Sequence, residues 1–371
     1  MISTATTTKP AAGTVTSAVT PVAVVRGRVL AIHIDPLRLP TSNAPLATLP
    51  MADVTHVIYA GGMLSANGEL DVVSTAARDL PTLADKSGTL RRRNPNFLAI
   101  LSIPIDSSPE WVRAIDTPEE RARFASSAML WLTRNNMDGL DLSLHLEKAT
   151  PEHLANVTIL ATILRDALAA LTNWQVRRLP MQLSMTATED VLLNKLNLIK
   201  LAPLIDGLYI RPNDVSQVKQ LTHLAPGASA ARLAAALTKA SLSTSLATAT
   251  VPLLAAKFSG ASGSAMVGTP TPAPPALVYL TDAACNPRAI GGLPIYDTRE
   301  VAGIMYHPGS KGKEWVSMET VESARAKAEM RGVGGCIVWF GEQLVIEGGE
   351  RGEVEILEAV RGGLKGNGLV A

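Results

Sequence analysis

The sequence predicts an α/β fold: a closed (β/α)8 barrel, also called a TIM barrel, in which eight parallel strands are surrounded by helices. Short apolar segments of strand length recur along the chain, and most are followed by a segment of helix length before the next one. Repeating βα units over roughly 320 residues favour a closed barrel over an open sheet. A doubly wound open sheet is the alternative, but no glycine-rich turn follows the first strand to hold a phosphate.

Eight segments have strand character because they are short and largely apolar. An apolar character on both faces is typical of parallel strands that are covered on both sides. In chain order, the expected strands span residues 28–34, 54–60, 96–103, 138–147, 180–186, 205–210, 243–249 and 335–339.

Two of the helices carry clear start signals. Thr117 is expected to be the N-cap of the first, with Pro118 in the first helical position and Glu120 closing a capping box. The second starts in the same way at Thr150 and Pro151, and a broad apolar face follows.

Two segments stand apart from the repeating pattern. Residues 1–27 are rich in Thr, Ala and Ser, which predicts an extended, flexible N-terminal arm before a barrel that fills residues 28–371. Residues 259–303 are rich in Gly, Pro and Ala, and we expect them to form an insertion between the seventh strand and the last helix, which is expected over 320–330.

Composition excludes several functional classes. The 371 residues are 47% hydrophobic and 18% charged with a net charge of +1, so we expect a buried core and no binding of nucleic acid or an anionic membrane. No segment approaches the roughly 20 apolar residues that span a bilayer.

The N-terminal segment lacks an apolar signal-peptide core, so the expected location is intracellular or within a particle released without a signal. Cys285 and Cys336 predict no disulfide framework.

The segment 138–147 is the most informative in the chain. Its sequence, Asp-Gly-Leu-Asp-Leu-Ser-Leu-His-Leu-Glu, alternates apolar and polar residues from Leu140 onward. This period of two is typical of a strand with one face in a polar site. We therefore expect Asp141, Ser143, His145 and Glu147 to share one face.

This strand resembles the D-G-x-D-x-D-x-E strand of chitinases in glycoside hydrolase family 18. The resemblance runs from about Val29 to Phe340. It includes Ser184-Met-Thr-Ala in the fifth expected strand, residues 315–329 before the last helix, and Gly334-Gly-Cys-Ile-Val-Trp339 in the final strand. Trp339 matches the tryptophan at the floor of the family's sugar site.

The resemblance implies a chemistry for which this sequence lacks key residues. In the family, a Glu protonates the glycosidic oxygen and an Asp two residues earlier orients the substrate's N-acetyl group, which attacks in place of an enzyme nucleophile. Asp138 and Asp141 match the family strand, whereas Ser143 replaces the orienting Asp and His145 replaces the acid. After the sixth strand, Arg211 and Asn213 stand where Met and Tyr are typical.

These replacements predict a degenerate, catalytically inactive site. Weak hydrolysis through Glu147 or His145 is an alternative, although a cationic imidazolium would destabilise the oxocarbenium-like transition state. A second alternative is a lectin that holds N-acetylglucosamine-type glycans through Trp339, Asp141, Asp214 and Tyr209. We expect no metal or cofactor; a metal site from two of His33, His56 and His145 with the carboxylate of Asp141 is a weaker interpretation.

The favoured interpretation is a structural or docking subunit of a larger protein assembly, such as a phage tail, an injection particle or a toxin complex. The N-terminal arm and the 259–303 insertion are the expected contacts with other protein subunits. The scarcity of aromatic residues, 4% of the chain, argues against a long sugar-binding groove.

Overall fold

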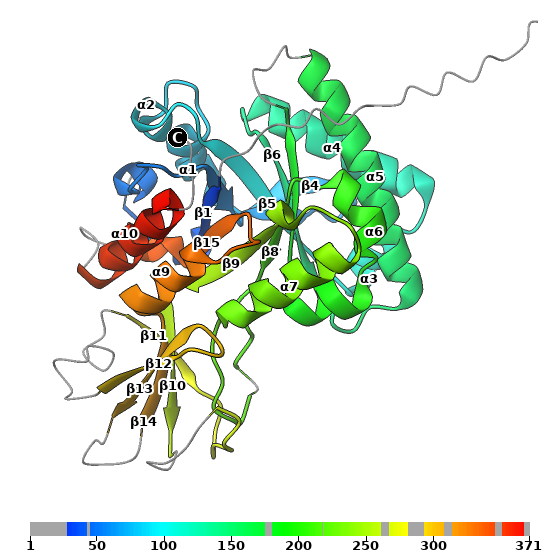
Figure 1. Ribbon diagram of the computed structural model, residues 1–371. Helices are drawn as coiled ribbons and strands as arrows, with labels where there is room; N and C mark the ends of the chain where they lie inside the picture. Colours follow the sequence, from blue (N-terminus) through cyan, green and yellow to red (C-terminus); the bar gives the residue numbers. More distant parts are fainter. Residues whose placement is uncertain are drawn as a thin grey trace, which may run out of the picture.

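The computed structural model describes residues 28–42, 45–174, 180–216, 218–260, 267–280, 293–307, 314–345 and 351–366. Within them, eight parallel strands close into a barrel in the order β1-β15-β9-β8-β7-β6-β5-β2, and β2 pairs back with β1 (Figure 1). The barrel predicted from the sequence is confirmed. Its strands are β1 (Val29–Ile34), β2 (His56–Tyr59), β5 (Leu98–Asp106), β6 (Gly139–His145), β7 (Gln182–Ala187), β8 (Gly207–Ile210), β9 (Ala247–Pro252) and β15 (Gly335–Trp339).

Helices cover the outside of the barrel, and a two-stranded hairpin of β3 (Gly62–Leu64) and β4 (Leu70–Val72) follows β2. The described helices are α1 (Ala76–Leu83), α2 (Thr89–Arg93), α3 (Pro109–Ala114), α4 (Pro118–Arg134), α5 (Pro151–Trp174), α6 (Leu198–Leu201), α7 (Gly227–Lys239), α9 (Val321–Glu329) and α10 (Arg351–Gly366). The capping box at Thr117 is present in full, because Glu120 and Thr117 satisfy each other's backbone amides.

All eight expected strands are present, and the largest shift concerns the seventh. Its expected start at Ser243 is wrong because the Ser243 side chain caps a short helical turn, Thr244–Leu246, by accepting the amide of Ser245. Side-chain acceptors of this kind compete with strand pairing. The strand β9 therefore begins only at Ala247.

Two apolar layers stabilise the barrel. One lies between the outward faces of the strands and the helices, and it contains residues such as Leu140, Leu142 and Leu144 of β6. The other lies inside the barrel and is made by Val29, Ala31, Ile58, Ile100, Tyr209, Ile337 and Trp339. Fully burying one large apolar side chain contributes roughly 1.5–3 kcal/mol. The stability of the barrel therefore comes from these two layers rather than from its rim, which is formed by the carboxyl ends of the strands.

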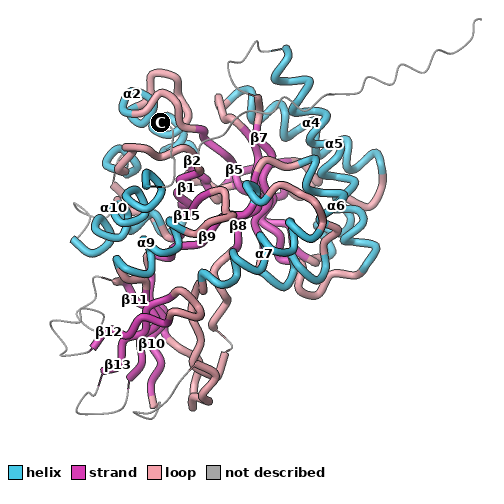
Figure 2. Tube along the Cα trace, viewed as in Figure 1, coloured by secondary structure: helices cyan, strands magenta, loops and turns pink. Residues whose placement is uncertain are grey.

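A five-stranded antiparallel sheet separates β9 from α9 in the chain, and we call it the insertion sheet. Its order is β11-β10-β14-β13-β12, and it projects from one side of the barrel beneath α9 (Figures 1 and 2). Its strands are β10 (Leu254–Ser259), β11 (Ala276–Tyr279), β12 (Leu293–Asp297), β13 (Ala302–His307) and β14 (Glu314–Met318).

The insertion sheet extends beyond both expected boundaries, 259 and 303. It begins directly after β9, and β14 completes it because Phe258 pairs in register with Trp315. Parts of the expected segment, 261–266 and 281–292, lie outside the described residues, as does the expected arm 1–27.

One helix corrects the expectation that no segment is apolar enough to cross a membrane. Among the described residues, Pro151–Asn173 of α5 meets that criterion by length and composition. It follows β6 and precedes β7 in the chain, and Val157, Leu160 and Leu164 belong to the core beneath it. A long apolar helix in the outer ring of a barrel meets the same criterion as a membrane span, so its composition does not decide between the two.

Candidate active site

Asp138 lies at the opposite end of the barrel from the rim. It precedes β6, where its carboxylate accepts the amide of Ala99 at 2.8 Å and pairs with Arg91. Asp206 does the same before β8, accepting the amide of Leu183 at 2.8 Å. Asp138 therefore stabilises the start of β6. It lies apart from Ser143 and His145, with which the sequence motif grouped it.

Asp141 lies inside the barrel, fully buried. Its carboxylate accepts hydrogen bonds from Ser102 at 2.7 Å, Ser184 at 2.8 Å and Thr186 at 3.0 Å. Burial raises the pKa of Asp141, and the three hydroxyl groups partly offset that rise because they stabilise the charged form. All the partners come from strands that pair with β6, so this carboxylate joins neighbouring strands below the rim.

Ser143 and His145 follow on the same face of β6 and reach the rim. Ser143 is buried, and its Oγ lies 3.4 Å from Nε2 of His145. The guanidinium of Arg211, one residue beyond β8, crosses the end of β7 to meet His145. Its Nη1 contacts both ring nitrogens and lies 2.6 Å from Nε2. Arginine only donates and a neutral imidazole has a single acceptor nitrogen, so one of the two ring nitrogens accepts and the ring is neutral in this contact.

The electrostatics of His145 agree with that assignment. Much of the side chain is exposed, yet its ring nitrogens face Arg211 rather than solvent. Desolvation of the ring, and then the positive charge of Arg211, lower the pKa of His145, while Glu147 and Asp106 act in the opposite direction. The lowered pKa favours the neutral imidazole, which is the form that accepts from Arg211.

Glu147 lies two residues past the end of β6 and is exposed, as the spacing predicted. Its carboxylate pairs with Arg211 Nη2 at 2.7 Å and accepts from Thr188 at 3.3 Å. Its backbone oxygen accepts from Lys195, which belongs to a π-helical turn, Val191–Lys195. Arg211 thus contacts both residues that the sequence offered as substitute proton donors.

Trp339 and Tyr209 are inside the barrel. Trp339 ends β15 and is 6% exposed, and His33 stacks on it with ring centroids 3.7 Å apart and an interplanar angle of 21°. One face of the indole is therefore covered by protein. Tyr209, 3% exposed, belongs to the apolar cluster that fills the barrel. Asp214 lies apart from both: it is exposed in the loop after β8, where it accepts the amide of Ser216 at 3.0 Å.

We compared this barrel with a family model and with solved structures. The family model for glycosyl hydrolases family 18 matches residues 38–343, which is most of the chain. The chain belongs to glycosyl hydrolase family 18. No group of three or more His, Cys, Asp or Glu residues that would hold a metal occurs in the part of this family member that the structure describes.

Solved structures of this family share the fold. A mutant class V chitinase from Nicotiana tobaccum in complex with NAG4 matches with a TM-score of 0.75 and 16% identity over 90% of this chain and 98% of that one. A family 18 chitinase from Cycas revoluta with (GlcNAc)3 gives 0.74 and 17% over 90% and 99%. The chitinase ChiW from a Paenibacillus species gives 0.74 and 17%; the match covers 91% of this chain but only 33% of that multi-modular enzyme.

The sequence did not single out Glu342, a buried acid next to the rim of this family 18 barrel. It follows β15 in the turn Gly341–Leu344, its Oε2 accepts the amide of Asp35 at 3.3 Å, and Oε1 has no hydrogen-bond partner among the described residues. Burial raises the pKa of Glu342 to about 7. The turn packs so closely on β1 that a Cβ on Gly341 would lie 2.3 Å from Ile32 Cγ2, which explains the glycine.

Proposed function

We propose that this chain is a non-hydrolytic member of family 18 that acts as a structural or docking subunit of a larger protein assembly. The observation that carries the loss of hydrolysis is the contact of one guanidinium, that of Arg211, with both His145 and Glu147. Family 18 chemistry needs a proton donor beside the glycosidic oxygen and a carboxylate that orients the N-acetyl group.

Neither requirement is met by the residues on the inner face of β6. His145 accepts a hydrogen bond from a permanent cation, so it has no proton to give from that nitrogen. Glu147 is held by Arg211 and Thr188 outside the strand. Ser143 carries no charge, and the carboxylate of Asp141 is occupied by three hydroxyl groups. These contacts support a fold that has kept its core and lost its chemistry.

The test of inactivity uses the purified chain and chitooligosaccharides, with products measured by mass spectrometry. We expect no cleavage above a buffer control. Cleavage that Glu147→Gln or His145→Ala abolishes would overturn the proposal, because it would assign the proton transfer to one of these two residues.

A role in an assembly is supported by the insertion sheet, which adds a second packed surface beside the barrel, together with the polar sequence of residues 1–27. Deleting residues 1–25 tests the arm. We expect the assembly state in analytical ultracentrifugation to change, whereas an unchanged state would reject the arm as a docking element. Recovery of the native protein always alone, at its monomer mass, would reject the assembly role.

A glycan-binding role is the second candidate, proposed on the presence of Asp141 and Trp339. The covered indole counts against it, since sugar stacking requires an open ring face and His33 occupies one. A glycan array with N-acetylglucosamine oligomers separates the two roles. Specific binding that Trp339→Ala removes would favour the lectin.

A further inference from the structure

The loop after β8 belongs physically to the insertion sheet. We call residues 211–226 the β8–α7 loop; residue 217 is outside the described range. Three of its apolar side chains form a small core with strands β10 and β14, separate from the two layers of the barrel. The members of this core are Val215, Leu221, Leu224, Leu254, Ala256, Phe258 and Trp315. Burial of this small core holds the β8–α7 loop against the insertion sheet.

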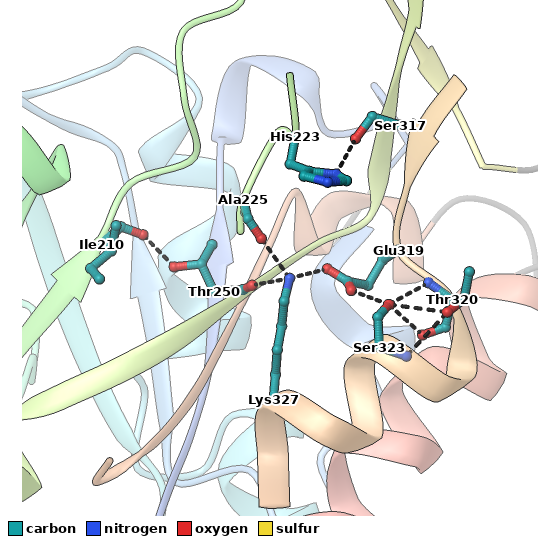
Figure 3. Close-up of polar contacts among 9 residues, drawn as sticks. All are labelled: Ile210, His223, Ala225, Thr250, Ser317, Glu319, Thr320, Ser323 and Lys327. Atoms are coloured by element: carbon teal, nitrogen blue, oxygen red, sulfur yellow. Dashed lines mark hydrogen bonds and ion pairs between the residues drawn. The ribbon is translucent and has the colours of Figure 1, made fainter. Parts of the chain in front are cut away.

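Buried polar contacts hold the end of the loop to the same body. His223 lies between Ser317 Oγ of β14, at 3.3 Å, and Asp297 Oδ2 of β12, at 3.2 Å. Figure 3 shows Lys327 rising from α9 toward Ala225 and Thr250. Its Nζ donates to Ala225 O at 2.6 Å and Thr250 O at 2.9 Å.

The cation of Lys327 is paired as well as hydrogen-bonded. Glu319, just after β14, forms an ion pair with it, and both side chains are almost completely buried (Figure 3). A buried charge of this kind is stable only while every partner stays in place. The network therefore joins β9, the β8–α7 loop and the end of the insertion sheet into one unit.

Ser317, His223 and Asp297 contact one another in the sequence Ser–His–Asp that a hydrolase triad uses. Their surroundings exclude that role. Ser317 lies on β14, between β10 and β13 in the middle of the sheet, and is 6% exposed. A substrate carbonyl has no approach to a hydroxyl in that position. The three residues instead fasten the loop.

The start of the loop is tied to its fastened end. Asn213 donates its amide to Leu224 O at 2.7 Å and its side chain to His223 O at 3.0 Å. Arg211 stands only two residues before Asn213. Its side chain is the one that covers His145 and Glu147 at the rim.

We infer that Arg211 is a gate over the rim of β6, and that the insertion sheet holds it closed through the β8–α7 loop. In the closed state Arg211 covers the ring nitrogens of His145 and neutralises Glu147. Displacement of the insertion sheet with its loop withdraws the guanidinium and leaves an imidazole and a carboxylate facing solvent together. This inference rests on the proposed function and deepens it. A partner that binds the insertion sheet can then uncover His145 and Glu147.

The experiment measures access rather than turnover, so its result is independent of the test for hydrolysis. Diethyl pyrocarbonate acylates unprotonated imidazoles, and peptide mass spectrometry reports the rate at His145 alone, with buried His33 as an internal reference. We expect Arg211→Ala to raise the His145 rate roughly tenfold, as expected when a mostly closed state opens.

Three further variants test the coupling. Lys327→Met and Leu224→Ala loosen the loop at two independent places, one polar and one apolar, and both should raise the His145 rate while Arg211 is intact. Lys257→Met is the matched control, because it removes an ion pair with Glu314 at 3.1 Å within the insertion sheet and Lys257 does not belong to the small apolar core that holds the loop. It should leave the rate unchanged.

Two results would overturn the inference. Equal His145 rates in the wild type and Arg211→Ala would show that Arg211 covers nothing. A raised rate in Arg211→Ala with wild-type rates in both loop variants, each confirmed as folded by circular dichroism, would show that the insertion sheet does not hold the gate. If Lys327→Met fails to fold, Leu224→Ala alone decides the coupling.

Discussion

Arg211 Nη1 lies 2.6 Å from Nε2 of His145, although His145 ends β6 and Arg211 follows β8, two strands separated by β7. A permanent cation donates here to a titratable ring. The contact exists only while the imidazole is neutral, because protonation would place two positive charges within hydrogen-bonding distance. The same guanidinium meets Glu147 through its other terminal nitrogen.

Removing the guanidinium should raise the pKa of His145. In the wild type, desolvation and then the charge of Arg211 lower this pKa, and Arg211→Ala relieves both because it also admits water to the ring. The change is measured by NMR titration of the imidazole protons. A pKa of His145 that is the same in both proteins would reject the contact with Arg211.

The fold was predictable because its signals are local. Eight apolar segments and the capping pairs Thr117-Pro118 and Thr150-Pro151 depend on period and on neighbouring residues, and the structure contains each of these elements. The insertion was harder. Residues 315–318 look like the approach to a helix in sequence, but they form β14 through pairing with β10, a contact that local sequence does not contain.

The site was predictable strand by strand but not across strands. The period of two predicts that Asp141, Ser143 and His145 share one face, and their contacts with the inner side chains of neighbouring strands and with each other agree. The sequence marks Arg211 as unusual after the sixth strand, but it carries no sign that this side chain reaches His145 on β6. The orphaned carboxyl of Glu342 carries no motif at all. The motif shows the order of Asp138 along the chain but not its contacts, which are the amide of Ala99 and the guanidinium of Arg91 at the start of β6.

Glu342 should make the protein less stable as the pH rises. Its pKa in the folded state is raised to about 7, above its ordinary value of 4.5, so the folded state holds a proton that the unfolded state releases first. The stability is full below about pH 4.5 and is lost as pH rises toward 7, by on the order of 3 kcal/mol. Glu342→Gln should remove this slope in urea unfolding measured from pH 4.5 to 8. An unchanged slope would show that Glu342 does not titrate in this range.

Lys327→Met should destabilise the fold strongly. The substitution leaves the Glu319 carboxylate buried and unpaired, which costs about 3–5 kcal/mol. The double variant Lys327→Met, Glu319→Leu should recover most of that loss, because a buried ion pair contributes little more than a well-packed apolar pair. Urea unfolding of the two variants provides the check, and a double variant as unstable as the single one would contradict the explanation.

Asp138→Ala and Asp206→Ala should behave alike. Each carboxylate accepts a backbone amide of the preceding barrel strand and pairs with an arginine, Arg91 or Arg165. Each loss should therefore cost about 1–3 kcal/mol in unfolding free energy. Neither variant should move the NMR signals of His145. A shift of those signals in Asp138→Ala alone would place Asp138 in the rim site after all.

Restoring one acid should not restore hydrolysis. In His145→Glu, the new carboxylate would lie within reach of Arg211, which would pair with it in the way it now pairs with Glu147 and keep it ionised. A general acid must instead hold a proton at the working pH, and the N-acetyl group needs its orienting carboxylate.

The combination Ser143→Asp, His145→Glu, Arg211→Met supplies both acids and also removes the cation. We expect cleavage of chitooligosaccharides by this triple variant only, with the double variant Ser143→Asp, His145→Glu, which keeps Arg211, as the matched control. Activity in His145→Glu alone would show that Arg211 does not block the site.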